Sequence, residues 1–180
     1  ITGISKRFSP SAPLALDNVD ISIHSGEAVG IVGESGSGKT TLARCLIGLE
    51  SFDSGNISWS INTPMAQRAQ IVFQDPTSAL NPAMTIGSSL AEALRASHRD
   101  KSEVPALLQL VGLPAEYANR YPSGLSGGEQ QRVAIARSIA PRPKLLICDE
   151  PVSSLDVSVQ AQILNLMNSL LKELGIALLF

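Results

Sequence analysis

The sequence predicts an α/β fold with a largely parallel central sheet, and three observations lead to this prediction. Short apolar runs that suit buried strands recur along the chain, for example at residues 28–32 and 145–148. Segments with helical periodicity follow them, from about residue 40 and from about residue 157. Turn signals separate the two kinds of segment. Strands that alternate with helices are typical of a parallel sheet covered by helices.

Length and composition fit one domain and exclude several classes of protein. The chain has 180 residues, 44% of them hydrophobic, which is too apolar for a disordered segment. Its 14 basic and 16 acidic residues give a net charge of -2, so no nucleic-acid partner is expected. No apolar run approaches the roughly 20 residues of a membrane span. Cys45 and Cys148 lie among aliphatic residues, and we interpret them as core residues of a protein from a reducing compartment.

The first thirty residues are predicted to be rich in strands. Val19, Ile21 and Ile23 alternate with polar residues, as in a half-buried strand. The continuous apolar run at 28–32 ends at Gly33 and suits a strand that is buried on both faces of a parallel sheet.

A helix is predicted next, from about Thr40, because leucines follow at helical spacing. These leucines are Leu42, Leu46 and Leu49. Two short strands are expected after it, at 57–59 and at 71–73, and the second ends at Gln74.

Residues 79–140 change character, and we interpret them as an inserted helical subdomain. Apolar residues recur at helical spacing over 86–94 and 104–111. A third helix is expected from about Gly128 to Ala140, where prolines stop it. The surrounding α/β core would consist of residues 1–78 and 141–180.

The strand pattern returns at 145–148, and an amphipathic helix is expected from about 157 to 174. Its apolar stripe is predicted to consist of Ala161, Leu164, Leu171 and Leu174. Another buried strand begins at Ile176, and the chain stops at Phe180.

A phosphate-binding loop is predicted between the apolar strand at 28–32 and the helix that begins at about Thr40. The pattern G-x-x-x-x-G-K-[ST] is matched by Gly33, Glu34, Ser35, Gly36, Ser37, Gly38, Lys39 and Thr40. Successive backbone amides of such a loop can face phosphate oxygens at a helix N-terminus. Lys39 can reach the outer phosphates, and the Thr40 hydroxyl can ligate magnesium. The alternative is a glycine-rich turn with a solvated lysine.

A second motif, an apolar strand that ends in two carboxylates, supports the P-loop NTPase interpretation. Asp149 and Glu150 follow the strand at 145–148. An aspartate at this place can hold Mg²⁺, and the next carboxylate can act as a general base on water. The alternative is a strand end with a solvated Asp-Glu-Pro turn.

The sequence Leu-Ser-Gly-Gly-Glu-Gln-Gln-Arg at 125–132 resembles the signature motif of ATP-binding cassette (ABC) ATPases, the nucleotide-binding subunits of ABC transporters and their relatives. The resemblance covers nearly the whole chain, with the motifs in family order. It implies a RecA-like core with an N-terminal antiparallel β part, and ATP and Mg²⁺ as cofactors. Residues 1–180 would then form a single, incomplete ABC ATPase domain.

The resemblance assigns roles to residues of the core. Phe8 matches the aromatic residue that stacks on adenine, with a core phenylalanine as the alternative. Gln74 matches the glutamine that touches magnesium and its waters, next to Thr40 and Asp149. Catalytic roles are implied for Glu150, Lys39 and Gln74, and Thr41 joins the residues that bind the nucleotide.

The resemblance also implies a site shared between two subunits. Ser126, Gly127 and Gly128 match the segment that contacts the γ-phosphate of ATP held by the opposite subunit. Their expected place at a helix start agrees, because amides and the helix dipole there can face an anion. Asp156 matches the loop that couples the two sites. The family also expects a histidine after the last strand, and we expect it beyond Phe180.

The extended segments 74–82 and 157–162 look like those of oligopeptide, dipeptide and nickel importers. The resemblance implies a homodimer or a paralogous second ATPase, a membrane permease, a solute-binding protein, and a place at the cytoplasmic face of the membrane. The alternatives are a soluble ABC ATPase, of the phosphonate-breakdown type or acting on translation or DNA, and a small-molecule kinase. The signature motif argues against the kinase.

Overall fold

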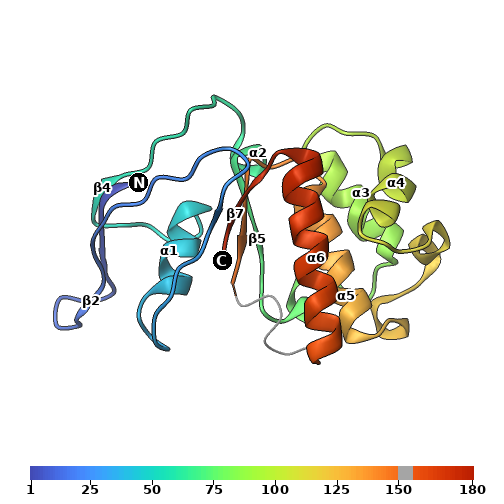
Figure 1. The fold of residues 1–180 in the computed structure, drawn as a ribbon, viewed down its shortest axis with the longest axis horizontal. Helices are drawn as coiled ribbons and strands as arrows, with labels where there is room; N and C mark the ends of the chain where they lie inside the picture. The colour runs from blue at the N-terminus through green and yellow to red at the C-terminus, as the bar shows by residue number, and fades with distance from the viewer. Residues whose placement is uncertain (150–155) are drawn as a thin grey trace.

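The computed structural model describes residues 1–149 and 156–180, which form two sheets and a group of helices (Figure 1). The smaller sheet is antiparallel and lies at the N-terminal side, in the order β2-β1-β4. Its strands are β1 (Thr2–Arg7), β2 (Leu14–Val19) and β4 (Ser54–Asn56). This sheet confirms the antiparallel N-terminal part.

The larger sheet is parallel throughout, in the order β3-β7-β6-β5. Its strands are β3 (Ala28–Val29), β5 (Ala69–Val72), β6 (Leu145–Cys148) and β7 (Ala177–Leu179). The β5–β6 ladder pairs Ala69 with Leu145 and Val72 with Cys148, so both strands end together. The α/β prediction with a largely parallel sheet is therefore confirmed.

The apolar run of β6 is buried on both faces and lies between two hydrophobic clusters. Leu145 and Ile147 pack into a cluster with α1 (Lys39–Leu46) and the antiparallel sheet. Leu146 and Cys148 point to the other side, into a cluster with the remaining long helices. Alternate residues of a strand face opposite sides, so one four-residue strand joins the two halves of the core.

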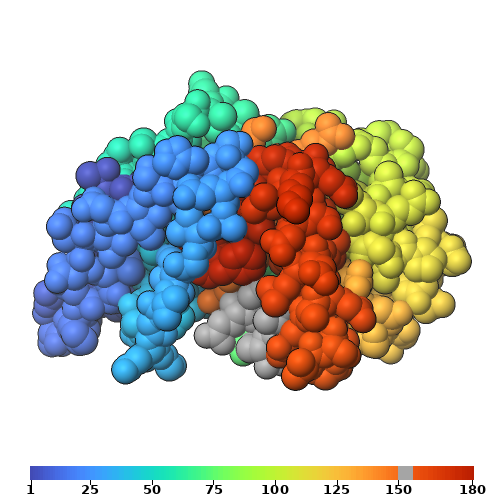
Figure 2. Space-filling view, in the orientation of Figure 1, coloured from blue at the N-terminus to red at the C-terminus, as the bar shows by residue number. Residues whose placement is uncertain are grey.

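Four longer helices cover the second face. They are α3 (Ile86–Ala96), α4 (Val104–Leu110), α5 (Gly127–Ile139) and α6 (Val157–Leu174), and α2 (Met65–Arg68) lies beside β5. Three of the four, α3, α5 and α6, begin at side-chain caps. Single turns of 3₁₀ helix connect them: η1 (Pro76–Ala79), η2 (Lys101–Glu103), η3 (Ala115–Asn119) and η4 (Pro122–Gly124). Within the described residues, no helix has the length and apolar character that a membrane crossing needs. Figure 2 shows α6 on the molecular surface that faces the viewer.

Three expectations about strands in the N-terminal half are wrong. Val19, Ile21 and Ile23 are half-buried as expected, but β2 ends at Val19 and no strand follows over 20–24. β3 stands at the end of the strand order, beside β7, and the pairing continues to Ile31, whose amide donates to the Phe180 carbonyl at 2.7 Å. Ala28 is exposed and Val32 is 98% exposed, so the apolar run is not buried on both faces. The short strand is also displaced: β4 is formed by the Ser-Gly-Asn segment 54–56, which pairs with β1, and not by 57–59.

The predicted apolar stripe of α6 is wrong except at Leu171, which packs partly buried against the core, because Ala161, Leu164 and Leu174 are exposed. The helix has the expected bounds, but Ile163, Met167 and Leu170 face the core, whereas Leu164 is 42% exposed. Apolar residues lie on both sides of this helix, so periodicity alone could not identify the buried side. Leu49, expected on the inner face of the first helix, lies beyond the end of α1 and is 66% exposed.

Candidate functional site

Most of the candidate site residues lie past the carboxyl ends of the parallel strands. The chain leaves β3 toward the loop at 33–38, and Gln74 and Asp149 follow β5 and β6. In Figure 1 this loop and the start of α6 lie along the lower edge of the molecule. In open parallel sheets, ligands bind outside the carboxyl ends of the strands. The topology therefore places the predicted residues where such a site is expected.

The loop at 33–38 is held closed by the side chain that follows it. The Lys39 ammonium donates hydrogen bonds to the carbonyl oxygens of Gly33, at 2.7 Å, and of Glu34, at 2.9 Å. The Ser37 amide donates to the Glu34 carbonyl at 3.2 Å. These bonds gather the loop around one cation, which can also attract phosphate oxygens.

Gly38 makes the transition from this loop into α1. Its φ of 96° lies in the left-handed region, where glycine is favoured. A Cβ atom at this position would lie 2.2 Å from the Ala15 carbonyl oxygen, so any side chain would collide with the backbone of β2. The second glycine of the motif is therefore required by both conformation and space.

The two predicted magnesium ligands meet at the start of α1. The Thr40 hydroxyl donates to the Asp149 carboxylate, at 2.9 Å to Oδ2 and 3.2 Å to Oδ1, across 109 residues of sequence. Both side chains offer oxygen atoms, which Mg²⁺ prefers. Within 1–149 and 156–180, no group of three or more His, Cys, Asp or Glu side chains gathers.

A pocket of about 420 Å³ joins the start of α1 to the exposed ring of Phe8. Ligand pockets typically have volumes of about 300–1,000 Å³. Phe8 is 60% exposed, so the alternative of a core phenylalanine is wrong. The pocket is lined by Phe8, Ala12, Pro13, Leu14, Ala15, Ser35, Gly36, Gly38, Lys39, Thr40 and Thr41. Sequence reasoning missed the segment 12–15, which leads into β2 and carries no recognisable motif.

Gln74 and Glu150 have implied catalytic roles besides Lys39. Gln74 is exposed and lies two residues after the end of β5. The Asp149 amide donates to the Val72 carbonyl at 3.1 Å, so the two strand ends adjoin, and Gln74 and Asp149 both follow them. Glu150, the predicted general base, lies outside the described residues.

Ser126 caps α5 and begins the signature segment. Its hydroxyl and amide both donate to Glu129 Oε2 at 2.8 Å, and the Tyr117 hydroxyl donates to Glu129 Oε1 at 2.8 Å. The bond from the Ser126 amide, followed by those from Tyr117 and the Ser126 hydroxyl, lowers the pKa of Glu129. This capping box fixes Ser126, Gly127 and Gly128 at a helix start, where amides can face an anion.

Asp156 caps α6 in a similar way. Its carboxylate accepts from the Ser158 hydroxyl at 2.7 Å and the Val159 amide at 3.0 Å, and these bonds lower its pKa. The starts of α5 and α6 touch, because a Cβ atom on Gly128 would lie 2.7 Å from Val159 Cγ1. The structure thus brings Gly128 and Asp156 to neighbouring helix starts, while the hydroxyl of Ser126 is bonded within its own helix.

The sequence is similar to a family of known proteins. The ABC transporter family model matches residues 16–153. The oligopeptide transport ATP-binding protein OppF of Lactococcus lactis is 44% identical over 182 residues, 93% of this chain and 57% of the relative. OppF of Escherichia coli is 43% identical over 187 residues, 95% of this chain and 56% of the relative. The chain therefore spans about half the length of the curated relatives it matches.

Solved structures resemble the fold over almost its full extent. The ATP-binding cassette MJ0796, in a dimeric post-hydrolysis state bound to ADP and Pi, has a TM-score of 0.81 and 29% identity. The match covers 99% of this chain and 84% of the MJ0796 chain. The protein cbiO1 from Clostridium perfringens, part of the ABC transporter complex cbiONQ, has a TM-score of 0.84 and 27% identity. The match covers 99% of this chain and 75% of the cbiO1 chain.

Proposed function

The chain belongs to the ABC transporter family, and from this premise we propose that it binds and hydrolyses ATP to power peptide import through a separate membrane permease. The observation that carries the ATP site is the bond between the Thr40 hydroxyl and the Asp149 carboxylate, beside a closed phosphate loop. The names of the oligopeptide transport relatives support the choice of substrate class.

Each residue of the core has a definite task in this proposal. The amides of the loop at 33–38 and the Lys39 ammonium bind the phosphates, and Lys39 exchanges its two carbonyl partners for phosphate oxygens as the nucleotide enters. Thr40 and Asp149 would hold Mg²⁺, with Gln74 near it. The bound ion would neutralise charge that develops on the phosphates.

Phe8 provides the other end of the nucleotide site. Its exposed ring lines the same pocket as the phosphate loop, so one ligand can contact both the aromatic ring and the phosphate-binding residues. Stacking of a base on an aromatic ring stabilises binding by about 1–3 kcal/mol. Glu150 is proposed as the general base that activates water for attack on the γ-phosphate.

We propose that two subunits complete each site head to tail. Ser126, Gly127 and Gly128 begin a helix that packs on the far side of the sheet from α1. In a dimer, the signature segment of one subunit would face the γ-phosphate bound by the other, and Asp156 would couple the two sites. Closure would exclude water, and loss of the γ-phosphate contacts would reopen the dimer. The second subunit is an identical copy or a paralogue.

The remaining partners follow from the transport proposal. A polytopic permease would sit in the membrane, this subunit would lie at its cytoplasmic face, and a solute-binding protein would deliver the peptide. Co-purification of the protein with a polytopic membrane protein would support transport. Isolation without such a partner, but with ribosomes or DNA, would instead favour a soluble ABC ATPase.

The test of the ATP site is Thr40→Val, which keeps the shape of the side chain but removes the hydroxyl. We expect Mg²⁺ affinity in the presence of ATP, and turnover with it, to fall by about 10–100-fold. Thr2→Val, on the exposed side of β1, is the matched control and should change neither. Normal Mg²⁺ dependence in Thr40→Val would contradict the assigned site.

A further inference from the structure

A nearly buried lysine lies beneath the exposed aromatic ring of the nucleotide pocket. Lys6 is 7% exposed, and its ammonium lies 5.3 Å from the centroid of the Phe8 ring. The same ammonium contacts Glu50 Oε1 at 3.0 Å and donates to Ser51 Oγ at 3.3 Å. A buried charge is costly unless it is paired, so these partners fix its position.

The contact between Lys6 and Phe8 joins the end of β1 to the chain that follows it. Lys6 lies in β1, and Phe8 lies two residues later, one residue past the end of the strand. A cation within about 6 Å of a ring centroid is attracted by the π face. One face of the Phe8 ring is thus held by a fixed cation, although the residue as a whole is 60% exposed.

We propose that Lys6 is a positioning residue of the nucleotide site, which holds the Phe8 ring so that its opposite face receives the base. The inference rests on the proposed ATP site. An exposed ring would otherwise lose rotational freedom when a base binds, and fixing it beforehand removes part of that cost. The cation also draws electron density toward itself, which favours stacking of an electron-rich purine on the other face.

The partners of Lys6 connect the two ends of the site. Glu50 and Ser51 follow α1, the helix that begins at the phosphate loop, whereas Phe8 follows β1. The Lys6–Glu50 pair therefore fastens the end of β1 to the chain leaving α1. This connection sets the distance between the Phe8 ring and the phosphate loop, and one ATP molecule must span that distance.

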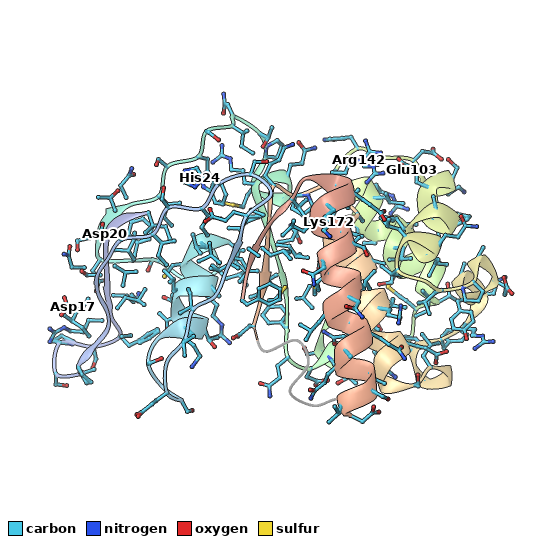
Figure 3. All side chains as sticks on the ribbon, viewed as in Figure 1. Asp17, Asp20, His24, Glu103, Arg142 and Lys172 are labelled. Atoms are coloured by element: carbon cyan, nitrogen blue, oxygen red, sulfur yellow. The ribbon has the colours of Figure 1, made fainter. Side chains whose placement is uncertain are left out.

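The test compares ATP with tripolyphosphate, which has the phosphates but no base. Lys6→Met keeps the apolar stem and removes the charge. We expect its affinity for ATP to fall by about 3–10-fold, because the ring is no longer held, while affinity for tripolyphosphate is unchanged. Lys172→Met, on α6 and away from the pocket (Figure 3), is the charge-matched control and should bind both ligands normally.

Two further variants separate positioning from general destabilisation. In a Phe8→Leu background, Lys6→Met should cause no additional loss of ATP affinity, because no ring remains to be held. Lys6→Arg should restore most of the affinity, since it keeps a cation near the ring. If Lys6→Met does not fold, as judged by circular dichroism, Glu50→Gln replaces it and should give a smaller loss confined to ATP.

The possible outcomes are distinct. Equal losses for ATP and tripolyphosphate, a loss that persists in the Phe8→Leu background, or unchanged ATP affinity would each overturn the role of Lys6 while leaving the ATP site intact. Failure of the unaltered protein to bind either ligand would overturn the proposed function, and this inference with it.

Discussion

The site residues of the α/β core and those of the helical region, residues 79–140, are held in place by different kinds of contact. In the core, Thr40 meets Asp149 across 109 residues, because parallel strands bring their carboxyl ends to one edge. In the helical region, Ser126 is fixed by Glu129, three residues away in its own capping box. The first arrangement depends on the whole sheet, and the second depends mainly on local sequence. Substitutions in the two regions should therefore have different effects on activity and on stability.

The helical region is nevertheless not an independent unit. Its helices share one continuous hydrophobic cluster with Leu146, Cys148 and Leu178 of the parallel sheet. The Ser138 hydroxyl of α5 also donates to the Ile71 carbonyl of β5 at 3.0 Å. Changes at the start of α5 should therefore affect the stability of the whole domain, whereas changes at the phosphate loop should mainly affect chemistry.

The largest effect is expected on the core side, at the proposed general base. Glu150→Gln should lower turnover by about 10²–10⁴-fold, because the amide cannot accept a proton from water. ATP affinity should stay near normal, and bound ATP should hold the dimer together, because a ligand that bridges two subunits stabilises their assembly. Turnover and size-exclusion chromatography with ATP measure both effects.

The outcome that would contradict this prediction is normal turnover together with a monomer at high protein and ATP concentrations. Glu116→Gln, on the surface of the helical region, is the matched control and should resemble the unaltered protein.

A smaller effect, on stability, is expected from Gly128→Ala in the helical region. The new Cβ atom would lie 2.7 Å from Val159 Cγ1, so the Val159 side chain or the starts of α5 and α6 must shift. Such overpacking costs about 1–3 kcal/mol of the free energy of unfolding. Denaturant titration measures the loss, and Val159→Ala in the same chain should restore part of it.

The control for this substitution is Gly124→Ala, because a Cβ atom there meets nothing within 4 Å. Equal stability of the Gly128 and Gly124 variants would show that the starts of α5 and α6 are not in tight contact.

The smallest effect concerns pH and the capping box. Hydrogen bonds, first that of the Ser126 amide, lower the pKa of Glu129 from its ordinary value of 4.5. A lowered pKa means that this carboxylate stabilises the fold fully above pH 4.5 and loses its contribution as the pH falls through the folded-state pKa.

The free energy of unfolding of Glu129→Gln should therefore lie below that of the unaltered protein at pH 7, by at most about 1 kcal/mol. The difference should shrink below about pH 4.5. Urea titrations at pH 7 and pH 3.5 compare the two proteins, and a constant difference would exclude a role for the Glu129 charge.

Local features could be predicted from the sequence, and long-range ones only in part. The strand at 145–148 and the helix at 157–174 have the predicted bounds, because an unbroken apolar run and a capped amphipathic segment are local signals. The wrong choice of the buried side of α6 and the exposed Val32 reflect the neighbours of each element, which periodicity does not reveal. The pairing of the segment 54–56 with β1 could not be predicted from periodicity either.

The site shows the same limit. The motif identified the loop that ends at Lys39, and the resemblance identified Phe8. Neither revealed that Lys6 lies under the Phe8 ring, because the strand pairing is irregular after Lys6 and β1 ends at Arg7. Ala15 was missed too, because its backbone oxygen, and not its side chain, faces Gly38.

The central claim is that the core of one subunit and the helical region of another form each site. Mixing a Lys39→Ala subunit with a Ser126→Arg subunit tests it most directly, with each variant mixed with itself as the control. In a mixed dimer, both defects fall in one shared site and the other site is intact, so we expect ATPase activity well above that of either variant alone. If mixing restores no activity, each subunit works by itself and the shared-site account is wrong.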